Sequence, residues 1–312
     1  MGRLQGGPLI TARLPASRSS DGAPWIFAGR HPAVDVAECP RTREETVIRY
    51  PRAVSATQPR MVSYAQNGED VMIDRIFRAS SGFFIDVGAF HPVVDSVTRH
   101  FSLLGWTGIN IEADPDLCAE IARDRPNDIT LHCAAGRESG ETSLHRLGVR
   151  QCSTTSPEQF ARFDPSVRDT SRTLTVPVRT LADICQEYVR GDIDFLKIDV
   201  EGSERDVILG ADWTRFRPRL LVIEATRTGT SEPVHDAWEP VLLENGYHFQ
   251  YFDGINRYYL RTEDLSLAEQ MAAPVNYLDW YFSFRDMVLM GQLTGAGKAA
   301  ADLYETTPGG GA

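Results

Sequence analysis

The chain has 312 residues, of which 42% are hydrophobic, and its 32 basic and 43 acidic residues give a formal net charge of −11. This length is enough for one large domain or two small ones with a sizeable core. Binding to a phosphate backbone requires a concentrated positive surface, so we expect no nucleic-acid partner. No apolar run approaches the roughly 20 residues that a membrane helix needs, and we expect no membrane span.

The five cysteines are widely spaced and form no C-x-x-C pair. This spacing argues against a disulfide framework or a zinc site and suits a reducing compartment. The N-terminal region contains arginines but no compact apolar stretch that ends in a small-residue cleavage site. We therefore expect no signal peptide and a cytoplasmic location.

The two ends of the chain lack a regular pattern. Residues 1–60 are punctuated by Pro, Gly, Ser and Arg without a sustained apolar period, which predicts a poorly ordered N-terminal extension. We expect a single catalytic domain over residues 61–262. Residues 263–312 are predicted to form a C-terminal helical extension that ends in a frayed tail.

Between these ends, helical and strand patterns alternate. The expected elements, in chain order, are a helix at 64–78, a strand at 83–87, a helix at 95–104, a strand at 107–112, a helix at 115–123, a strand at 129–134, a loop-rich stretch at 151–172, a helix at 181–189, a strand at 193–200, a helix at 203–210, a strand at 219–225, a helix at 238–245 and strand-like runs at 247–253 and 256–260. This alternation predicts an α/β fold with a parallel sheet. The short turn at Gly254 and Ile255 can join only antiparallel strands, so we expect a hairpin at the end of the domain.

A first motif, Phe84-Ile-Asp86-Val-Gly88-Ala-Phe-His91-Pro, ends the first strand of this series. Doubly wound sheets bind their ligands at such strand ends. Asp86 can accept a hydrogen bond from an ammonium group, and Gly88 lets the backbone approach a ligand closely. The full G-x-G-x-x-G fingerprint is absent, which argues against a dinucleotide-binding domain.

A second signal is Glu112, which closes the next strand. A carboxylate at this position can accept hydrogen bonds from both ribose hydroxyls of an adenosine-containing cofactor. The alternative is a surface carboxylate on a loop. Asp114, two residues further on, stands where a helix cap before Pro115 is expected.

The third signal is the segment Asp194-Phe-Leu-Lys197-Ile-Asp199-Val-Glu201-Gly-Ser-Glu204. Alternate residues of a strand share a face, so Lys197, Asp199 and Glu201 are predicted to lie together. Three charges near the end of an interior strand are costly to bury without a function or mutual pairing. The alternative is a buried ion network whose members satisfy one another.

Together these motifs resemble those of the FkbM family of methyltransferases. The resemblance extends through Ser63-Tyr-Ala-Gln-Asn-Gly-Glu-Asp-Val, Trp106-Thr-Gly-Ile-Asn-Ile-Glu and Val176-Pro-Val-Arg-Thr-Leu-Ala-Asp. It implies a class I methyltransferase fold, which is Rossmann-like, with a mostly parallel seven-stranded sheet, a C-terminal antiparallel hairpin and helices on both faces. It also implies an S-adenosylmethionine-dependent O-methyltransferase that acts on hydroxyls of sugars, glycans or secondary metabolites.

The resemblance further implies the positions of the site residues. Cofactor contacts are expected from Asp86, Gly88 and Glu112 and from the neighbouring Ala89, Ala113 and Ala134. The reaction centre is expected at Asp199 and Glu201, together with Lys197.

Methyl transfer to a hydroxyl is an in-line displacement in which the hydroxyl proton must be taken or shared. The candidate bases are His91, Asp199 and Glu201, and we favour His91 slightly because an imidazole titrates near neutral pH. Its alternative role is a loop imidazole that only positions other groups. Asp199 and Glu201 could also supply oxygen ligands for Mg²⁺, but no third ligand is evident, and we assign no metal site.

The segment 148–173 is long enough to cover a substrate, and arginines such as Arg150 within it could meet an anionic acceptor. Two other functions stay open at this stage. A nicotinamide-dependent oxidoreductase would share Asp86, Gly88 and Glu112, but it is disfavoured by the missing glycines and the terminal hairpin. The other alternative is a non-catalytic, cofactor-binding partner subunit.

Overall fold

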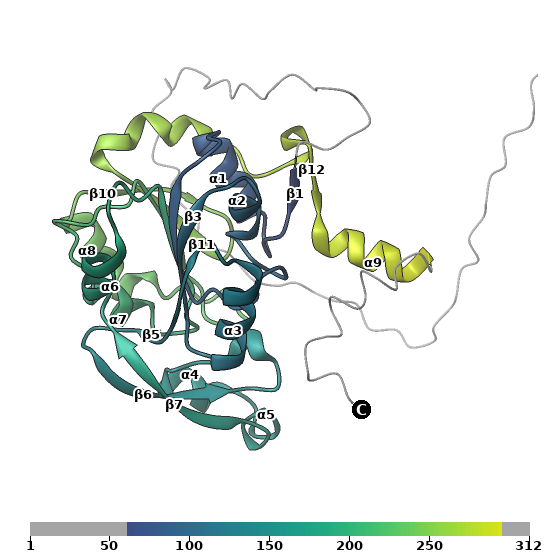
Figure 1. The fold of residues 1–312 in the computed structure, drawn as a ribbon, viewed down its shortest axis with the longest axis vertical. Helices are drawn as coiled ribbons and strands as arrows, with labels where there is room; N and C mark the ends of the chain where they lie inside the picture. The colour runs from purple at the N-terminus through teal and green to yellow at the C-terminus, as the bar shows by residue number, and fades with distance from the viewer. Residues whose placement is uncertain (1–60, 295–312) are drawn as a thin grey trace, which may run out of the picture. The chain divides into compact units, whose positions relative to one another are not determined.

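The computed structural model describes residues 61–294, and this part of the chain is built around a central sheet (Figure 1). The strands follow one another across this sheet in the order β10 (Tyr247–Phe252), β11 (Asn256–Arg261), β9 (Leu220–Glu224), β8 (Phe195–Ile198), β2 (Phe83–Val87), β3 (Thr107–Glu112) and β4 (Ile129–His132). All neighbouring pairs from β9 to β4 are parallel, whereas β11 is antiparallel to both β9 and β10. The predicted seven-stranded sheet with an antiparallel C-terminal hairpin is confirmed.

Two apolar clusters cover the two faces of this sheet. On one face, Ile85 and Ile198 pack with α6 (Leu181–Tyr188), α7 (Glu204–Leu209) and α8 (Glu239–Glu244). On the other face, Phe84 and Phe195 pack with α1 (Glu69–Phe77), α2 (Arg99–Leu103) and the 3-10 segment η3 (Thr262–Met271). Successive strand residues point to opposite faces, so runs such as Phe83–Val87 must be apolar nearly throughout. The expectation of helices on both faces is confirmed.

Several elements are shorter than their sequence patterns predict. The helix expected from residue 64 begins at Glu69, because the Asp70 carboxylate binds Ser63 Oγ at 2.6 Å and Tyr64 N at 2.7 Å and holds 64–68 in a turn. The strand expected at 193–200 ends at Ile198. The third helix, α3 (Pro115–Asp124), begins as predicted, with Asp114 as its N-cap.

The strand expected at 129–134 was predicted wrongly as one element. Its second part forms β5 (Ala134–Ala135), which leaves the central sheet and joins a small sheet with β7 (Arg172–Arg179) and β6 (Gly140–Arg146). The pairing of β6 with β7 is antiparallel.

The loop-rich stretch was also predicted wrongly, because much of it is helical. Its elements are η1 (Arg150–Cys152), α4 (Pro157–Arg162) and α5 (Pro165–Asp169). Both α helices have proline at the start and a polar N-cap, Ser156 and Asp164, whose side chain accepts a backbone hydrogen bond.

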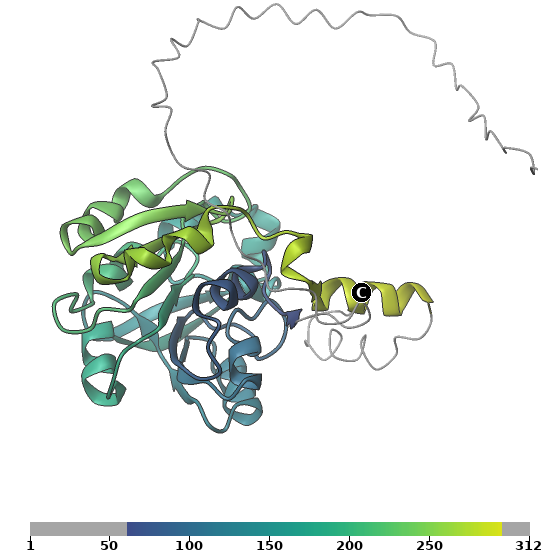
Figure 2. The ribbon, with the colours of Figure 1, turned by 90° about the horizontal axis from the view of Figure 1, so that it is seen from above.

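The segment after the hairpin is tied to α1 by a buried ion pair. After η3, the remaining elements are η4 (Tyr277–Asp279), β12 (Tyr281–Ser283) and α9 (Phe284–Thr294). Arg75 Nη2 lies 2.5 Å from Asp279 Oδ2, and both side chains are 1% exposed. β12 pairs in parallel with β1 (Met61–Ser63), while α9 extends away from the sheet (Figures 1 and 2).

The predicted division of the chain near residues 60 and 262 stays a prediction, and the extension expected over 1–60 lies outside the described residues. Among the residues that the structure describes, no helix combines the length and apolar character that a membrane crossing demands.

Candidate active site

The candidate site lies where the order of the parallel strands reverses. The chain reaches β4 by way of β3 on one side of β2, whereas β8 and β9 lie on the other side. In doubly wound sheets the crevice at the carboxyl ends of such strands is where ligands bind. Two cavities adjoin at this edge, and the chain segments after β2 and β8 separate them.

The first cavity, here called the narrow cavity, lies at the ends of β2 and β3 and is lined by residues that include Glu112, Ala113, Leu117, Ala134 and Arg150. The second, here called the wide cavity, has a volume of about 560 Å³ and is lined by residues that include Glu69, Lys197, Glu224 and Asn256. Both cavities share part of their walls, namely Gly88, Phe90, Gln151, Asp199 and Glu201. A ligand in either cavity therefore lies beside Asp199.

The structure gives a reason for glycine at position 88 that the sequence did not show. Its φ is +80°, and a Cβ built on it would lie 1.8 Å from the carbonyl oxygen of Asp199. The segment after β2 and the segment after β8 thus touch through their backbones, and a side chain at position 88 would separate them. Gly88 is required by this contact as well as by its place in the cavity walls.

Glu112 is positioned to bind hydroxyl groups in the narrow cavity. Its Oε2 accepts a hydrogen bond from Phe90 N at 2.8 Å, and its Oε1 accepts one from Asp114 N at 2.7 Å. Each carboxylate oxygen can accept a further bond, as two ribose hydroxyls would require. Burial raises the pKa of Glu112 to about 7. The alternative of an exposed loop carboxylate is wrong, since Glu112 is 8% exposed.

The rest of the lining of the narrow cavity is mostly apolar. Ile111, Leu117, Cys133 and Ala134 give it apolar walls. Arg150 is 8% exposed, and its guanidinium nitrogens have no hydrogen-bond partner, although ion pairs join it to Asp114 and Glu120. Apolar walls with a few convergent polar groups are typical of cofactor sites.

The three alanines expected at this site divide into two groups. Ala113 and Ala134 line the narrow cavity, and their contact with a cofactor stays a prediction. Ala89 is buried, and its N–H donates to Ile111 O at 3.2 Å, but it is not part of the lining.

Asp86 and Lys197 form a buried pair across β2 and β8. Lys197 Nζ lies 3.6 Å from Asp86 Oδ1 and 3.3 Å from Asp199 Oδ2, and it donates to Gly88 O at 3.4 Å. Burial lowers the pKa of Lys197, but the carboxylates of Asp199 and Asp86 outweigh burial and raise it. Asp86 lines neither cavity, so the ammonium group that it faces here is that of Lys197.

The carboxylates of the fourth strand do not share a strand face as predicted, because β8 ends at Ile198. Glu201 instead lies in a turn with φ of +56°. Thr228 Oγ1 donates to its carboxylate, and Thr154 Oγ1 donates to its backbone oxygen at 2.7 Å. This turn brings Glu201 to Asp199 at the boundary of the two cavities.

Sequence reasoning missed Glu224, which joins this group from the end of β9. One carboxylate oxygen from each of Asp199, Glu201 and Glu224 lies within 4.8 Å of the others. Burial, followed by repulsion from Asp199, raises the pKa of both glutamates. The available signal was an acidic residue that closes the expected fifth strand, as Glu112 closes the second.

His91, which the sequence favoured slightly as the base, lies outside both cavities. Its Nδ1 accepts hydrogen bonds from Val93 N at 3.0 Å and Val94 N at 2.9 Å. A neutral imidazole that accepts at Nδ1 carries its proton on Nε2 and has no lone pair left for a substrate proton. Burial, aided by Arg150, lowers the pKa of His91 to about 4. The geometry therefore favours the alternative role of a loop imidazole.

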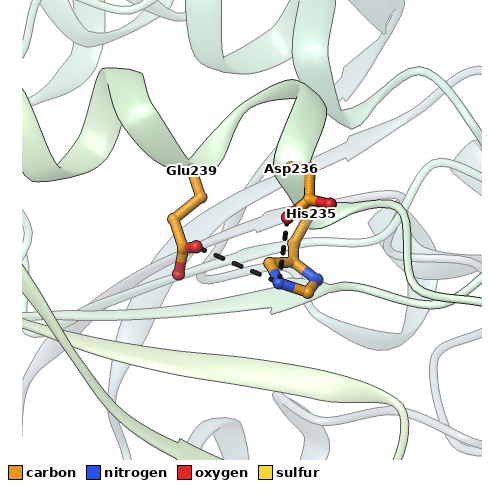
Figure 3. A group of neighbouring side chains, drawn as sticks. All are labelled: His235, Asp236 and Glu239. Carbon is orange, nitrogen blue, oxygen red and sulfur yellow. Dashed lines mark ion pairs between the residues drawn. The ribbon is translucent and has the colours of Figure 1, made fainter.

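A second group of potential ligands, His235, Asp236 and Glu239, lies at η2 (His235–Ala237) and the start of α8 (Figure 3). His235 Nε2 lies 3.4 Å from Asp236 and 4.0 Å from Glu239. Glu239 already accepts from Tyr259 Oη at 2.8 Å and from Arg257 at 2.7 Å. This group lines neither of the two cavities.

The sheet order, the antiparallel hairpin and a cavity at the strand switch are those of a class I methyltransferase fold. The model of the family described as "Methyltransferase FkbM domain" matches residues 86–249, which is over half of the chain. The chain belongs to this family. The oxidoreductase alternative does not agree with this membership.

Solved structures resemble the chain only distantly. A TehB-like SAM-dependent methyltransferase from Corynebacterium glutamicum aligns with a TM-score of 0.36 and 12% identity over 63% of this chain and 88% of that chain. Precorrin-6y C5,15-methyltransferase from Geobacter metallireducens aligns with a TM-score of 0.35 and 13% identity over 64% of this chain and 93% of that chain. A fibrillarin pre-rRNA processing protein from Methanococcus jannaschii aligns with a TM-score of 0.32 and 13% identity over 59% and 67%. No curated protein matches the chain.

Proposed function

We propose that this protein transfers a methyl group from S-adenosylmethionine to a hydroxyl oxygen of a polyhydroxylated acceptor, such as a sugar, a glycan or a secondary metabolite. One observation carries the proposal. The narrow cavity, to which we assign the cofactor, shares Gly88, Asp199 and Glu201 with a wide cavity that has a hydrogen-bonding wall. An acceptor in the wide cavity would lie next to carboxylates at the boundary.

The wall of the wide cavity supports a hydroxyl-rich acceptor. Its amide and hydroxyl side chains are Gln66, Gln151, Thr226, Thr228, Thr230, Ser231 and Asn256. Such groups both donate and accept, as the hydroxyls of a sugar do. The same wall contains several carboxylates and one ammonium group, which disfavours an anionic acceptor. Arg150, expected to meet such an acceptor, lines the narrow cavity instead.

The residues at the boundary can carry out the proton step. S-adenosylmethionine, when bound, supplies the electrophilic methyl group. A hydroxyl becomes a better nucleophile when a carboxylate shares its proton, and Asp199 and Glu201 are the carboxylates that face both cavities. Lys197 Nζ lies 3.3 Å from Asp199 Oδ2, so this ion pair holds the Asp199 side chain at the boundary of the two cavities. Asp86 in turn holds Lys197 in place.

Cofactor binding is tested by calorimetric titration with S-adenosylmethionine, S-adenosylhomocysteine and NAD⁺. We expect both sulfur compounds to bind and NAD⁺ not to bind. Replacing Glu112 by Gln should weaken binding by about 10- to 100-fold, because hydrogen bonds to a charged group are worth about 1.5–3 kcal/mol. The matched control is Asp116→Asn, which changes a carboxylate on α3 that is 61% exposed. Equal loss of affinity in both variants would contradict the assignment of Glu112.

Acceptor chemistry is tested by transfer of a labelled methyl group to a panel of sugars and other polyols, with amines and thiols of similar size as comparison compounds. We expect labelled ethers from the polyols, and we expect Asp199→Asn and Glu201→Gln to reduce turnover while S-adenosylhomocysteine still binds. Label found only in amine or thiol products would refute O-methylation and leave the cofactor assignment intact.

A further inference from the structure

We propose that Asp199, Glu201 and Glu224 form a binding site for one divalent cation that prefers oxygen ligands, Mg²⁺ or Mn²⁺, at the wall of the wide cavity. The cation would orient the acceptor hydroxyl, and only this role rests on the proposed function.

The spacing of the three carboxylates fits a shared ion. Their nearest oxygens all lie within 4.8 Å of one another. Oxygen ligands of Mg²⁺ lie about 2.1 Å from the metal, so ligand oxygens are about 3.0 Å apart when adjacent and about 4.2 Å apart when opposite. Side-chain rotations that bring the three carboxylates closer together would reach bonding distance. Glu201 and Glu224 come from different segments, the turn after β8 and the end of β9, so the fold and not a short motif brings them together.

Glu224 is a buried carboxylate without a donor among residues 61–294. It is 8% exposed and faces the wide cavity, yet no hydrogen bond or ion pair of the described residues involves its side chain. A glutamate that is buried to a similar extent in the same cavity does have hydrogen-bond donors. Glu69 is 4% exposed in the same cavity, and its carboxylate accepts from Asn67 N at 2.7 Å and from Asn256 Nδ2 at 3.0 Å. Buried charges are normally paired or bound to metals, and the Glu224 carboxylate, which lines the wide cavity without a protein partner among the described residues, is placed to bind a cation there.

The charge balance leads to the same conclusion. Asp199, Glu201 and Glu224 line this corner of the wide cavity, and Lys197 is the cation within ion-pair distance of Asp199 among the described residues. Three carboxylates against one ammonium group leave an excess of negative charge that a divalent ion would offset. Without such an ion the group takes up protons instead, in keeping with the raised pKa values of Glu201 and Glu224.

This site would act directly on the acceptor. Three carboxylates leave about three positions of an octahedron for water or acceptor oxygens. A hydroxyl bound to the cation is more acidic and is held in a fixed direction. Because Asp199 and Glu201 also line the narrow cavity, that hydroxyl would lie between the cation and the cofactor cavity.

The second acidic group does not meet the same criteria. In this group (Figure 3), Asp236 is 94% exposed. Glu239 already accepts hydrogen bonds from Arg257 and Tyr259. It therefore serves as an internal comparison.

The test is titration of the full-length protein with Mn²⁺, followed by the electron paramagnetic resonance signal of the free ion. We expect one saturable Mn²⁺ per chain that Mg²⁺ displaces. Glu224→Gln should weaken Mn²⁺ binding by at least about 10- to 100-fold. Loss of a residue that only supports a metal ligand already lowers metal affinity by that factor, and Glu224 would be a ligand itself. Glu69→Gln is the matched control, since it changes the same residue type in the same cavity and should leave Mn²⁺ binding unchanged.

Two results would overturn the site. One is the absence of saturable Mn²⁺ binding to the wild-type protein. The other is binding that survives Glu224→Gln and Glu201→Gln but is lost in Glu239→Gln, which would place the ion at the group in Figure 3. Calorimetric binding of S-adenosylhomocysteine to each variant checks that the fold is intact.

Failure of the cation site and failure of the proposed function give different results. Hydroxyl methylation that is undiminished in excess EDTA, together with no Mn²⁺ binding, would reject the cation and keep the O-methyltransferase. Mn²⁺ binding that depends on Glu224, without methylation of any hydroxyl, would keep the cation site and reject its role with the acceptor.

Discussion

Replacing Gly88 by alanine tests whether the backbone contact between the ends of β2 and β8 builds the site. Position 88 has φ of +80°, and the new Cβ would lie 1.8 Å from Asp199 O and 2.9 Å from Asp199 C. A left-handed conformation costs an L-residue roughly 1–2 kcal/mol. Overpacking against backbone adds about 1–3 kcal/mol. We therefore expect Gly88→Ala to lower the free energy of unfolding by about 2–5 kcal/mol.

Gly105 provides the matched control for this experiment. Its φ is +90°, but a Cβ there would have no neighbour within 4 Å, so Gly105→Ala should show only the conformational part. Urea unfolding of both variants measures the difference, and calorimetry measures the affinity for S-adenosylhomocysteine. We expect Gly88→Ala to be the less stable variant and to lose cofactor affinity. Equal destabilisation of the two variants, with cofactor binding intact, would refute the reasoning.

Three further predictions concern single side chains. The pKa of His91 in the folded protein is about 4, below its usual 6.5. The unfolded chain therefore binds the proton first, and this group lowers the free energy of unfolding as the pH falls from about 6.5 to 4. His91→Asn keeps a side-chain acceptor for the loop, so it should reduce this pH-dependent loss of stability, measured by urea unfolding at several pH values. The variant should also retain methyl transfer. Abolished turnover would support His91 as the base. Lys197→Met leaves the Asp86 carboxylate buried without its ion-pair partner and should lower the free energy of unfolding by about 3–5 kcal/mol in the same assay. Adding Asp86→Asn to this variant should restore part of that stability. Thr228→Val removes the hydroxyl that donates to Glu201 and should raise the acceptor KM without changing the affinity for S-adenosylmethionine; an unchanged KM would contradict the role given to Glu201.

The parts of the fold that the sequence predicted well are those governed by burial and chain direction. Both strands at 83–87 and 107–112 have the predicted limits, because buried interior strands need continuous apolar runs that end sharply. The hairpin followed from a turn too short for any other connection. The location of Glu112 at the carboxyl edge of the sheet followed from the same logic, whereas its role with the cofactor stays a prediction.

Other parts depended on contacts between distant segments, which one sequence does not reveal. Glu224 is separated from Glu201 along the chain, and only the pairing of β8 with β9 places their ends side by side. His91 was overvalued because its residue type suits proton transfer, whereas two backbone N–H groups of its own loop occupy its Nδ1. The helical segment at 150–169 was missed because each helix is too short for a recognisable apolar period.

The position of β11 between β9 and β10 limits how far the chain can be shortened. The family match covers residues 86–249, yet β11 begins at Asn256 and lies between β9 and β10 in the sheet. A fragment cut to the shared region would keep only the first half of β10, with no partner to hold it, and would uncover the edge of β9. It would also lack Arg75 and Asp279, whose buried ion pair joins α1 to η4, after the hairpin. The region that the family model matches is therefore smaller than the unit that must be expressed together to complete the sheet.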